Sequence, residues 1–339
     1  MMLSLRRAVS GCAVAATLVL VALTPSAGGT RVAAATSACN IDGVERTVAI
    51  GDVHGAADRL VEILKTTGLI DDKLHWVGGH THLVQTGDVV DRGPDSRRAL
   101  DLLRQLEGEA ARAGGAVHAL IGNHEVMRLL GDMRYVSPGE YAAFTTNKSE
   151  DTRQKFVEQA PPDQRDKVLR ETPLGLIEMR LAFGRDGEYG RWIRTHDAVA
   201  RINGVLFLHG GISPTVAAQS CDDINATVRR DLTSNLDKTR SAPLVTLTAR
   251  EDGPLWYRGL AQIAEADIDD ILTKQHAKAF VIGHTVTPNQ HVTPRFGGKV
   301  LMIDTGMQPA YVPTGRASAV EFLNGVATAI YTDSRESLH

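Results

Sequence analysis

The stretch Ile50-Gly51-Asp52-Val53-His54-Gly55 is the one around which the rest of this sequence is organised. It is typical of a short buried strand, residues 46–50, that opens into a glycine-containing turn. If the backbone stays extended there, Asp52 and His54 face the same side because alternate residues of a strand share a face. The pair could then bind one metal ion, although taken alone it also fits an ordinary strand-to-turn junction.

The same pattern recurs along the chain. Strands are expected at residues 82–85, 116–121, 204–208, 279–282 and 300–303, and each ends in a polar loop that contains glycine. Helices are expected at residues 57–69, from about 95 to the glycines at 114–115, and at 266–276. The alternation predicts an α/β fold in which neighbouring strands run parallel and their loops gather at one edge. A closing hairpin is expected at residues 317–331, turned at Asn324-Gly325.

These loops carry the side chains that could perform chemistry. Five of them present Asp52 and His54, Asp88 and Asp91, Asn123 and His124, His209, and His284. Oxygen and imidazole donors without thiolates suit manganese, iron or zinc, and argue against a structural cysteine–zinc site. The count suits two ions that share one carboxylate. Two ions roughly 3.5–4 Å apart can generate hydroxide at neutral pH and stabilise an in-line displacement at phosphorus.

The blocks GDVHG (51–55), GDVVDRG (87–93), GNHE (122–125) and HGG (209–211), in this order, resemble the signature of the phosphoprotein phosphatases within the binuclear metallophosphoesterases. The continuation GNHEVMRLLGDMRYV (122–136), together with GHT (283–285), is most similar to the bacterial-type Shewanella-like protein phosphatases. The resemblance spans about residues 46–306. It implies a metallophosphoesterase-type sandwich of two mixed β-sheets flanked by helices, with the metal site at the loops that follow the strand C-termini.

The resemblance also implies a set of metal ligands. Asp52 and His54 would bind the first ion, Asp88 would bridge both ions, and the second ion would be bound by Asn123, His209 and His284. The implied cofactors are two divalent metal ions, with manganese expected in vitro and iron or zinc as alternatives.

Residues beside these ligands have expected roles in catalysis. In an extended backbone His124 would project away from Asn123, which places it to protonate the leaving oxygen. Asp91 would hydrogen-bond that imidazole and favour its charged form. Arg92 offers a bidentate fork to phosphate oxygens. Arg258 is a second candidate for phosphate binding, and the alternative for it is a surface cation.

Other polar residues have weaker assignments. Asp304 follows an expected strand, where a structural or supporting role is favoured over ligation. His118 lies in an apolar strand and is expected in the core, and the histidines at 75, 80 and 82 are expected to be solvated. A basic rim that binds a phosphopeptide could be formed by Arg128, Arg134, Arg180, Arg191 or Arg194, with an ordinary solvated face as the alternative.

Composition places limits on the fold and on the partners. The 339 residues, 43% of them hydrophobic, can bury a substantial core, and a net charge of −3 gives no general basic signal. Nucleic acid is therefore not favoured as a partner. Residues 36–339 are expected to form one catalytic domain. Within it, 139–194 would be a helical insertion, although residues 148–165 are charged enough for partial disorder to be the alternative.

The N-terminus has the layout of a secretory signal. Arg6 and Arg7 precede an apolar run at residues 11–23, and small residues follow around 27 and 33–35. A membrane anchor is the alternative, but the run is short against the ~20 residues that span a bilayer. A secreted or periplasmic protein without a stable membrane anchor is therefore expected. In an oxidising compartment Cys39 and Cys221 could form a disulfide, with two unrelated buried thiols as the alternative.

Together these features predict a phosphomonoesterase, more specifically a protein phosphatase acting on phosphoprotein or phosphopeptide. The resemblance implies in-line attack by a metal-bridging hydroxide with His124 as the general acid. A hydrolase of dinucleoside polyphosphates or other phosphoanhydrides is the alternative because it shares the same blocks, but secretion argues against a nucleotide pool as its substrate. A binding module on an inactive scaffold would require a missing ligand, and none is missing. The choice between phosphotyrosine and phosphoserine or phosphothreonine stays open.

Overall fold

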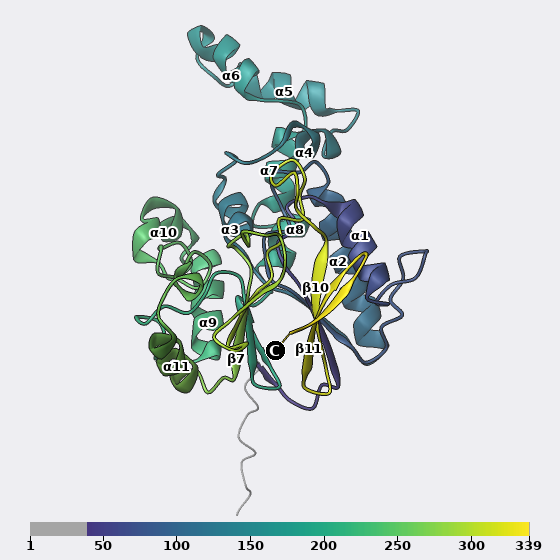
Figure 1. The fold of residues 1–339 in the computed structure, drawn as a ribbon. Helices are drawn as coiled ribbons and strands as arrows, with labels where there is room; N and C mark the ends of the chain where they lie inside the picture. Colours follow the sequence, from purple (N-terminus) through teal and green to yellow (C-terminus); the bar gives the residue numbers. More distant parts are fainter. Residues whose placement is uncertain (1–38, 339) are drawn as a thin grey trace, which may run out of the picture. The chain divides into compact units, whose positions relative to one another are not determined.

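The computed structural model describes residues 39–338, which form two mixed six-stranded β-sheets packed face to face, with helices outside them (Figure 1). This confirms the predicted α/β sandwich. The predicted leader, residues 1–35, lies outside the described residues. In the described part, none of the helices has the length and apolar character needed to cross a bilayer.

The first sheet contains the three strands predicted earliest in the chain. In spatial order its strands are β12 (Arg335–Leu338), β11 (Val326–Tyr331), β10 (Ser318–Leu323), β2 (Arg46–Ile50), β3 (His82–Gln85) and β4 (Ala116–Ala119). β2, β3 and β4 run parallel, so their C-terminal loops meet at one edge as predicted. β10 and β11 form the predicted hairpin, turned at Asn324 and Gly325, whose φ angles of 51° and 80° suit a tight hairpin turn. β12 was not predicted, because its polar sequence lacks a strand pattern.

The second sheet contains the strands predicted later in the chain. In spatial order its strands are β1 (Asn40–Ile41), β5 (Val199–Ile202), β6 (Val205–Leu208), β7 (Ala279–Ile282), β9 (Val300–Met302) and β8 (Thr293–Arg295). β6, β7 and β9 run parallel, which places the loops after β6 and β7 side by side. β5 was not predicted. Its turn to β6 uses Asn203-Gly204, with φ angles of 50° and 82°, a dipeptide that is typical of a hairpin.

Alternate strand residues divide between two apolar layers. Ala49 of β2 packs in the layer between the sheets, whereas its neighbours Val48 and Ile50 face the helices. Phe207 of β6 and Phe322 of β10 meet across the inner layer, with their ring centroids 5.8 Å apart. The two sheets are therefore held together by one face of each strand, while the other face binds the helices.

Helices lie on the outer side of each sheet (Figure 1). The first sheet is accompanied by α1 (Ala57–Thr66) and α2 (Ser96–Arg112), and the second by α9 (Cys221–Leu232), α10 (Leu236–Ser241) and α11 (Glu265–Lys274). α3 (Asn123–Leu130) follows β4 directly. α1 ends three residues before its predicted end, because the chain leaves the helix at Thr67 and Gly68 takes a φ of 68°.

Residues 138–193 contain several helices joined by short loops. Their helices are α4 (Pro138–Ala143), α5 (Ser149–Glu158), α6 (Arg165–Glu171), α7 (Leu176–Phe183) and α8 (Glu188–Ile193). α5 and α6 extend away from the sheets (Figure 1). Residues 149–158 form a regular helix, where partial disorder was the alternative.

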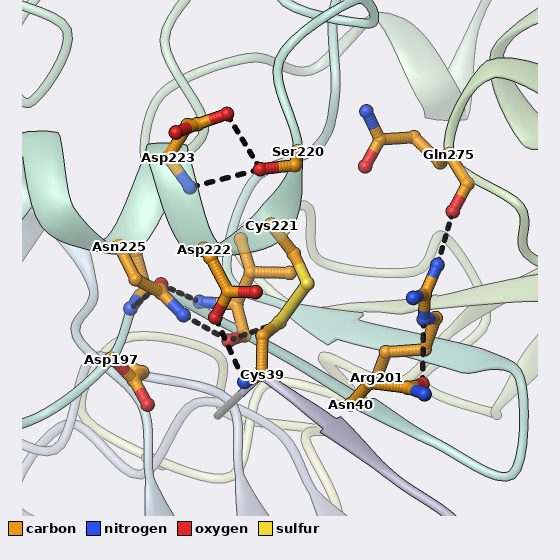
Figure 2. The surroundings of a disulfide bond; sticks show 12 residues. Cys39, Asn40, Asp197, Arg201, Ser220, Cys221, Asp222, Asp223, Asn225 and Gln275 are labelled. Carbon is orange, nitrogen blue, oxygen red and sulfur yellow. Dashed lines mark hydrogen bonds between the residues drawn. A yellow bond between two sulfur atoms is a disulfide. The ribbon is translucent and has the colours of Figure 1, made fainter. Parts of the chain in front are cut away.

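A disulfide joins Cys39 to Cys221, the first residue of α9 (Figure 2). The Cys39 N–H also donates to Asp222 Oδ1 at 3.1 Å. Next to it, β1 pairs with β5, and Arg201 Nε donates to Asn40 Oδ1 at 2.9 Å. The start of the described chain is therefore attached to α9 by a covalent bond and to the second sheet by a short strand.

Candidate metal centre and active site

The six predicted metal ligands gather where the loops after β2, β3, β4, β6 and β7 meet. Asp88 lies at their centre. The distances from Asp88 Oδ2 to three imidazole Nε2 atoms are 3.2 Å for His209, 3.7 Å for His54 and 3.8 Å for His124. Asn123 Oδ1 lies 2.8 Å from His209 Nε2. Asp88 therefore contacts residues from both sheets, which fits its predicted bridging position.

Asp52 occupies the other side of this cluster. Its carboxylate lies 3.9 Å from His54 Nε2 and 3.8 Å from His209 Nδ1, and it accepts the His284 N–H at 3.0 Å. The rings of His209 and His284 are 4.7 Å apart between centroids. All six predicted ligands are thus within one buried cluster, contributed by loops that are up to 232 residues apart in sequence.

The prediction that strand alternation orients Asp52 with His54, and Asn123 with His124, was wrong. Neither pair lies on extended backbone. His54 has a φ of 48°, because the Val53 and His54 N–H groups both donate to Asp88 O and bend the chain. Asn123 and His124 begin α3 instead of continuing β4. A tight turn and a helix N-terminus therefore bring these side chains together, and strand alternation does not.

The glycines beside the ligands have a steric reason. A Cβ at Gly122 would overlap Asp88 Oδ1, and a Cβ at Gly283 would overlap Asp52 Oδ1. Any side chain at either position would displace the carboxylate next to it. The two motifs therefore place glycine where the backbone must approach a ligand closely.

The histidine tautomers suit metal binding. Nδ1 of His54 lies 3.0 Å from Val90 O, and Nδ1 of His209 lies 3.0 Å from Thr86 O. A carbonyl can only accept, so these Nδ1 atoms carry the proton and each Nε2 keeps a free lone pair. His284 has the reverse arrangement, because its Nε2 lies 3.1 Å from Trp256 O and its Nδ1 is left free. Three imidazoles are thus oriented as ligands.

The carboxylates favour bound cations for an electrostatic reason. Burial, together with the neighbouring Asp304 and Asp88, raises the pKa of Asp52 well above its usual value. Burial is also the main cause that raises the pKa of Asp304 to about 6. Asp88 differs, since His209, His124 and His54 outweigh its burial and lower its pKa. Two groups of possible ligands share Asp88, namely Asp88 with His54 and His124, and Asp88 with His209 and His284. The residues therefore fit divalent cations.

His124 differs from the other imidazoles in its partner. Its Nδ1 lies 2.7 Å from Asp91 Oδ2, which is the predicted hydrogen bond. Burial by itself disfavours the imidazolium, but Asp88 and Asp91 outweigh it and raise the pKa of His124. Burial instead lowers the pKa of His54 to about 4. A charged imidazole cannot ligate a metal, so His124 is better suited to donate a proton than to bind an ion.

A cavity of about 670 Å³ opens onto the cluster, and Asn123, His124 and His284 are among its lining residues. Both predicted phosphate-binding arginines line it as well. The Arg92 guanidinium lies between two aromatic rings, 3.7 Å from the Tyr311 centroid and 4.9 Å from that of Tyr135. Arg258 is exposed and donates to His284 O and, at 3.2 Å, to Thr285 Oγ1. Arg258 is thus both a surface cation and part of the pocket.

The family model for calcineurin-like phosphoesterases matches residues 45–288, which include every predicted ligand. The chain belongs to the calcineurin-like phosphoesterase family. With its donor set, this membership makes it a metal-dependent phosphoesterase.

Several named proteins are similar to this phosphoesterase. Shewanella-like protein phosphatase 1 of Plasmodium berghei is 30% identical over 275 residues, covering 79% of this chain and 68% of the relative. Shewanella-like protein phosphatase 2 of Arabidopsis thaliana is 30% identical over 284 residues, covering 78% and 71%. The crystal structure of a cold-active protein-tyrosine phosphatase of a psychrophilic Shewanella species superposes with a TM-score of 0.71 at 30% identity, covering 89% and 82%.

A symmetrical bis(5'-nucleosyl)-tetraphosphatase of Escherichia coli is 31% identical to this phosphoesterase over 158 residues. That match covers 46% of this chain and 48% of the relative. The similarity to the nucleotide hydrolase is therefore confined to under half of the chain, whereas the protein phosphatases match over three quarters of it.

The predicted basic rim of this phosphoesterase is wrong for two of its arginines. Arg128 is fully buried and forms ion pairs with Asp91 and Glu140. Arg194 is also buried, and it donates to backbone carbonyls, including Leu232 O at 2.8 Å. Both side chains have buried partners that the sequence pattern did not reveal. Arg134 does line the pocket, where it pairs with Asp132.

Sequence reasoning missed other residues at the site. Tyr135 lies within the GNHEVMRLLGDMRYV block, which was the available signal, but no motif surrounds Tyr311. Asp304 was expected to support the site, and it lies beside Asp52 while accepting the Gly306 N–H at 3.0 Å. His118 is half-buried instead of in the core, with its Nε2 3.1 Å from His82 Nδ1.

Proposed function

We propose that this phosphoesterase is a protein phosphatase whose substrates are phosphorylated side chains of proteins or peptides. The pocket carries the proposal, because it joins the proposed acid His124 to two arginines and to aromatic walls. Tyr135, Trp256 and Tyr257 line it, and they offer apolar surface to an aromatic side chain. We therefore include phosphotyrosine among the proposed substrates, as the name of the similar Shewanella enzyme also suggests.

The proposed mechanism assigns a role to each group. Arg92 and Arg258 bind the phosphate oxygens and orient the phosphorus for in-line attack by a water oxygen. The new P–O bond forms as the ester P–O bond breaks. His124 gives its Nε2 proton to the leaving oxygen, since Asp91 holds its Nδ1. The attacking water keeps one proton in the inorganic phosphate product and releases the other to solvent. The dephosphorylated side chain leaves with the proton from His124, which solvent then replaces.

We propose two divalent ions as cofactors. Asp52 and His54 would hold one ion, Asn123, His209 and His284 would hold the other, and Asp88 would contribute to both sites. When bound, such ions lower the pKa of water and neutralise the charge on phosphate oxygens. Manganese is the proposed ion in vitro, with iron and zinc as alternatives, because a shell of oxygen and imidazole donors accepts each of these.

A substrate panel tests this proposal. Metal-loaded protein is assayed with a phosphotyrosyl peptide, a phosphoseryl peptide and diadenosine tetraphosphate, with Asp88→Asn as the inactive control. We expect kcat/KM for at least the phosphotyrosyl peptide to exceed that for the dinucleotide by about tenfold or more. Preferred cleavage of diadenosine tetraphosphate would instead establish the phosphoanhydride hydrolase. That alternative has less support, because its similarity covers under half of the chain.

Export to an oxidising compartment is part of the proposal. It is supported by the leader-like N-terminus and by the Cys39–Cys221 disulfide, since such bonds persist outside the reducing cytosol. Cell fractionation and N-terminal sequencing of the protein from its own host test it. A full-length chain in the cytosolic fraction would contradict export without affecting the phosphatase assignment.

A further inference from the structure

Asp91 connects the proposed acid to a second buried ion pair. One carboxylate oxygen, Oδ2, lies 2.7 Å from His124 Nδ1, and the other, Oδ1, accepts from Arg128 Nη2. The same Nη2 donates to Glu140 Oε2 at 2.8 Å. A continuous series of buried hydrogen bonds therefore runs from His124 through Asp91 and Arg128 to Glu140 of α4.

Arg128 is held on several sides. Its side chain is fully buried, although it begins on α3, the helix that also carries His124. Met179 Sδ of α7 lies 2.8 Å from its Nη1, and its guanidinium is 5.0 Å from the Phe183 ring centroid. Both of those residues belong to the stretch 138–193, as does Glu140. Three of the four groups around the guanidinium thus come from this helical stretch, and the fourth is Asp91.

Asp91 has little other support for its orientation. It lies in the loop after β3 with a φ of 74°, and its N–H donates to Ser96 Oγ at 3.1 Å. Glu140, in contrast, is anchored in a capping box with Ser137 at the start of α4. The Ser137 hydroxyl in turn donates to Gly93 O at 3.0 Å, next to the Asp91 loop. Within this series of hydrogen bonds, Glu140 is therefore held in place by α4, whereas the orientation of the Asp91 carboxylate depends on its bond to Arg128.

We propose that Arg128 and Glu140 are positioning residues for proton donation, through which α4 and α7 hold the Asp91 carboxylate in the orientation that directs His124 Nε2 toward the leaving group. This inference rests on the proposed function, in which His124 is the general acid. A guanidinium bound to two carboxylates keeps one oxygen of Asp91 occupied, so the other stays on His124 Nδ1. Without it, the carboxylate can rotate and release the imidazole.

The leaving group separates this role from a purely structural one. Nitrophenolate departs readily without a proton, whereas phenolate needs one. A misdirected acid therefore slows phenyl phosphate much more than p-nitrophenyl phosphate, while general damage to the fold or to the metal centre slows both equally. The ratio of kcat/KM for the two esters is the readout.

The experiment compares Glu140→Gln and Arg128→Lys with wild-type metal-loaded enzyme. Gln cannot form the charged pair. Lys has one nitrogen in place of the planar guanidinium, so it cannot contact both carboxylates and Met179 Sδ in the same geometry. We expect each variant to lose about tenfold more activity on phenyl phosphate than on p-nitrophenyl phosphate, within the roughly 10²–10⁴-fold that general acid catalysis provides. The matched control is Glu178→Gln on α7, whose carboxylate accepts from Ser149 Oγ at 2.6 Å. It should leave the ratio unchanged.

A double-mutant comparison completes the test. His124→Asn alone should give the largest change in the ratio, and adding Glu140→Gln to it should change the ratio no further, because both act through the same proton. Equal losses on the two esters, or an added effect in the double variant, would overturn the inference. Thermal melting shows whether each variant is folded. If Glu140→Gln is unfolded, the ratio measured for Arg128→Lys decides the test. A ratio unaffected by His124→Asn would instead reject the proposed role of His124, so the two failures are distinguishable.

Discussion

Five residues of the site have backbone φ angles in the left-handed region, where side chains are disfavoured. These are His54 at 48°, Asp88 at 58°, Asp91 at 74°, Arg92 at 68° and His284 at 63°. Each such residue costs on the order of 1–3 kcal/mol unless its surroundings hold it. Residue-level strain is therefore concentrated where ligands must point inward from tight turns, and specific hydrogen bonds must oppose it.

Glu125 provides several of those hydrogen bonds. Its carboxylate accepts the N–H groups of Asp88 at 2.8 Å, Val89 at 2.8 Å and Gly122 at 2.9 Å. It thereby connects the loop after β3 to the start of α3. The capping pattern between Gly122 and Glu125 includes the same carboxylate. Glu125 is thus a structural support for the ligand Asp88 and contacts it through the backbone alone.

Glu125→Gln should destabilise the fold around the metal site, because it weakens the hydrogen bonds to the loop that carries Asp88. The amide offers one acceptor oxygen and turns an NH₂ group toward backbone donors, so we expect a loss of about 2 kcal/mol in the free energy of unfolding. Metal affinity should fall roughly 10- to 100-fold, because Asp88 is less well oriented. Urea unfolding and metal titration measure these effects. Glu62→Gln on the exposed side of α1 is the control, and equal behaviour of the two variants would contradict the assignment.

His118 predicts a pH dependence of stability. Burial and the neighbouring His82 lower its pKa to about 4 from the ordinary 6.5. Between these values the unfolded chain binds a proton that the folded chain does not, so the free energy of unfolding falls as the pH is lowered through that window. We expect His118 to account for about 2 kcal/mol of this loss.

The test for His118 is urea unfolding at pH values from 7 to about 4. His118→Gln should show a shallower loss of stability than wild type across this range. His80→Gln removes an exposed histidine and leaves the His82–His118 pair in place, so it should follow wild type. If the free energy of unfolding depends on pH with the same slope in wild type and in His118→Gln, the titration of His118 does not contribute to the loss of stability.

At the scale of elements, turns decide where functional residues lie. The strands that precede the site are short and apolar, and they differ little from the other strands of the two sheets. What distinguishes them is the loop that follows each strand C-terminus, or the N-terminus of α3 in the case of β4. Parallel neighbours bring these loops to one edge, which is the general location of ligand sites in such sheets.

The disulfide gives a prediction for β1 and α9. It closes a sequence separation of 182 residues, so its loss frees a large loop in the unfolded chain. We expect reduction, or Cys39→Ser, to lower the free energy of unfolding by about 2–4 kcal/mol. Turnover at 25 °C should be preserved, because the site loops follow other strands.

Thermal melts with and without reductant measure the effect of the disulfide. Protein beginning at residue 36 is used, because it lacks Cys12. Reductant should lower the melting temperature of wild type and leave that of Cys39→Ser unchanged. A wild-type melting temperature that does not respond to reductant would contradict a stabilising disulfide.

At the scale of the whole molecule, the site joins the two sheets. Asp52, His54, Asp88 and Asn123 follow strands of one sheet, whereas His209 and His284 follow strands of the other. Bound ions would therefore connect the halves of the sandwich as well as serve catalysis. Without cations, burial raises the pKa of Asp52, and the neighbouring carboxylates of Asp304 and Asp88 raise it further by repulsion.

Metal removal should thus reduce stability and activity together. Ions that bind only the folded state contribute about 2.7 kcal/mol at a free concentration one hundred times the Kd. We expect chelation to lower the melting temperature by several degrees and to abolish turnover, and manganese to restore both. Calorimetry measures the melting temperature, and a phosphatase assay on the same samples measures turnover. Asp88→Asn should show little response to chelator, and a full response in that variant would contradict its bridging role.

The resemblance of several sequence blocks to a known family implied the six proposed ligands, which lie in the loops that follow predicted strands. The sequence alone determined the α/β class and the parallel strands, because these follow from short-range patterns of apolar runs that end in glycine-containing loops. The Asn324-Gly325 hairpin was predictable for the same reason. Misplaced helix ends and the unpredicted strands β1, β5, β8 and β12 show the limit, since short or polar strands form only when a neighbouring strand supplies hydrogen bonds.

Only the tertiary structure decided how the side chains of residues 50–55 and of the residues around the site are oriented. Asp52 and His54 converge because Asp88 O bends the chain between them, which an extended strand would not do. Arg128 became a buried support instead of a surface cation because Asp91 and Glu140 meet it from different parts of the chain. Such partners are invisible to a local pattern, because folding alone brings distant charges into contact and removes them from water.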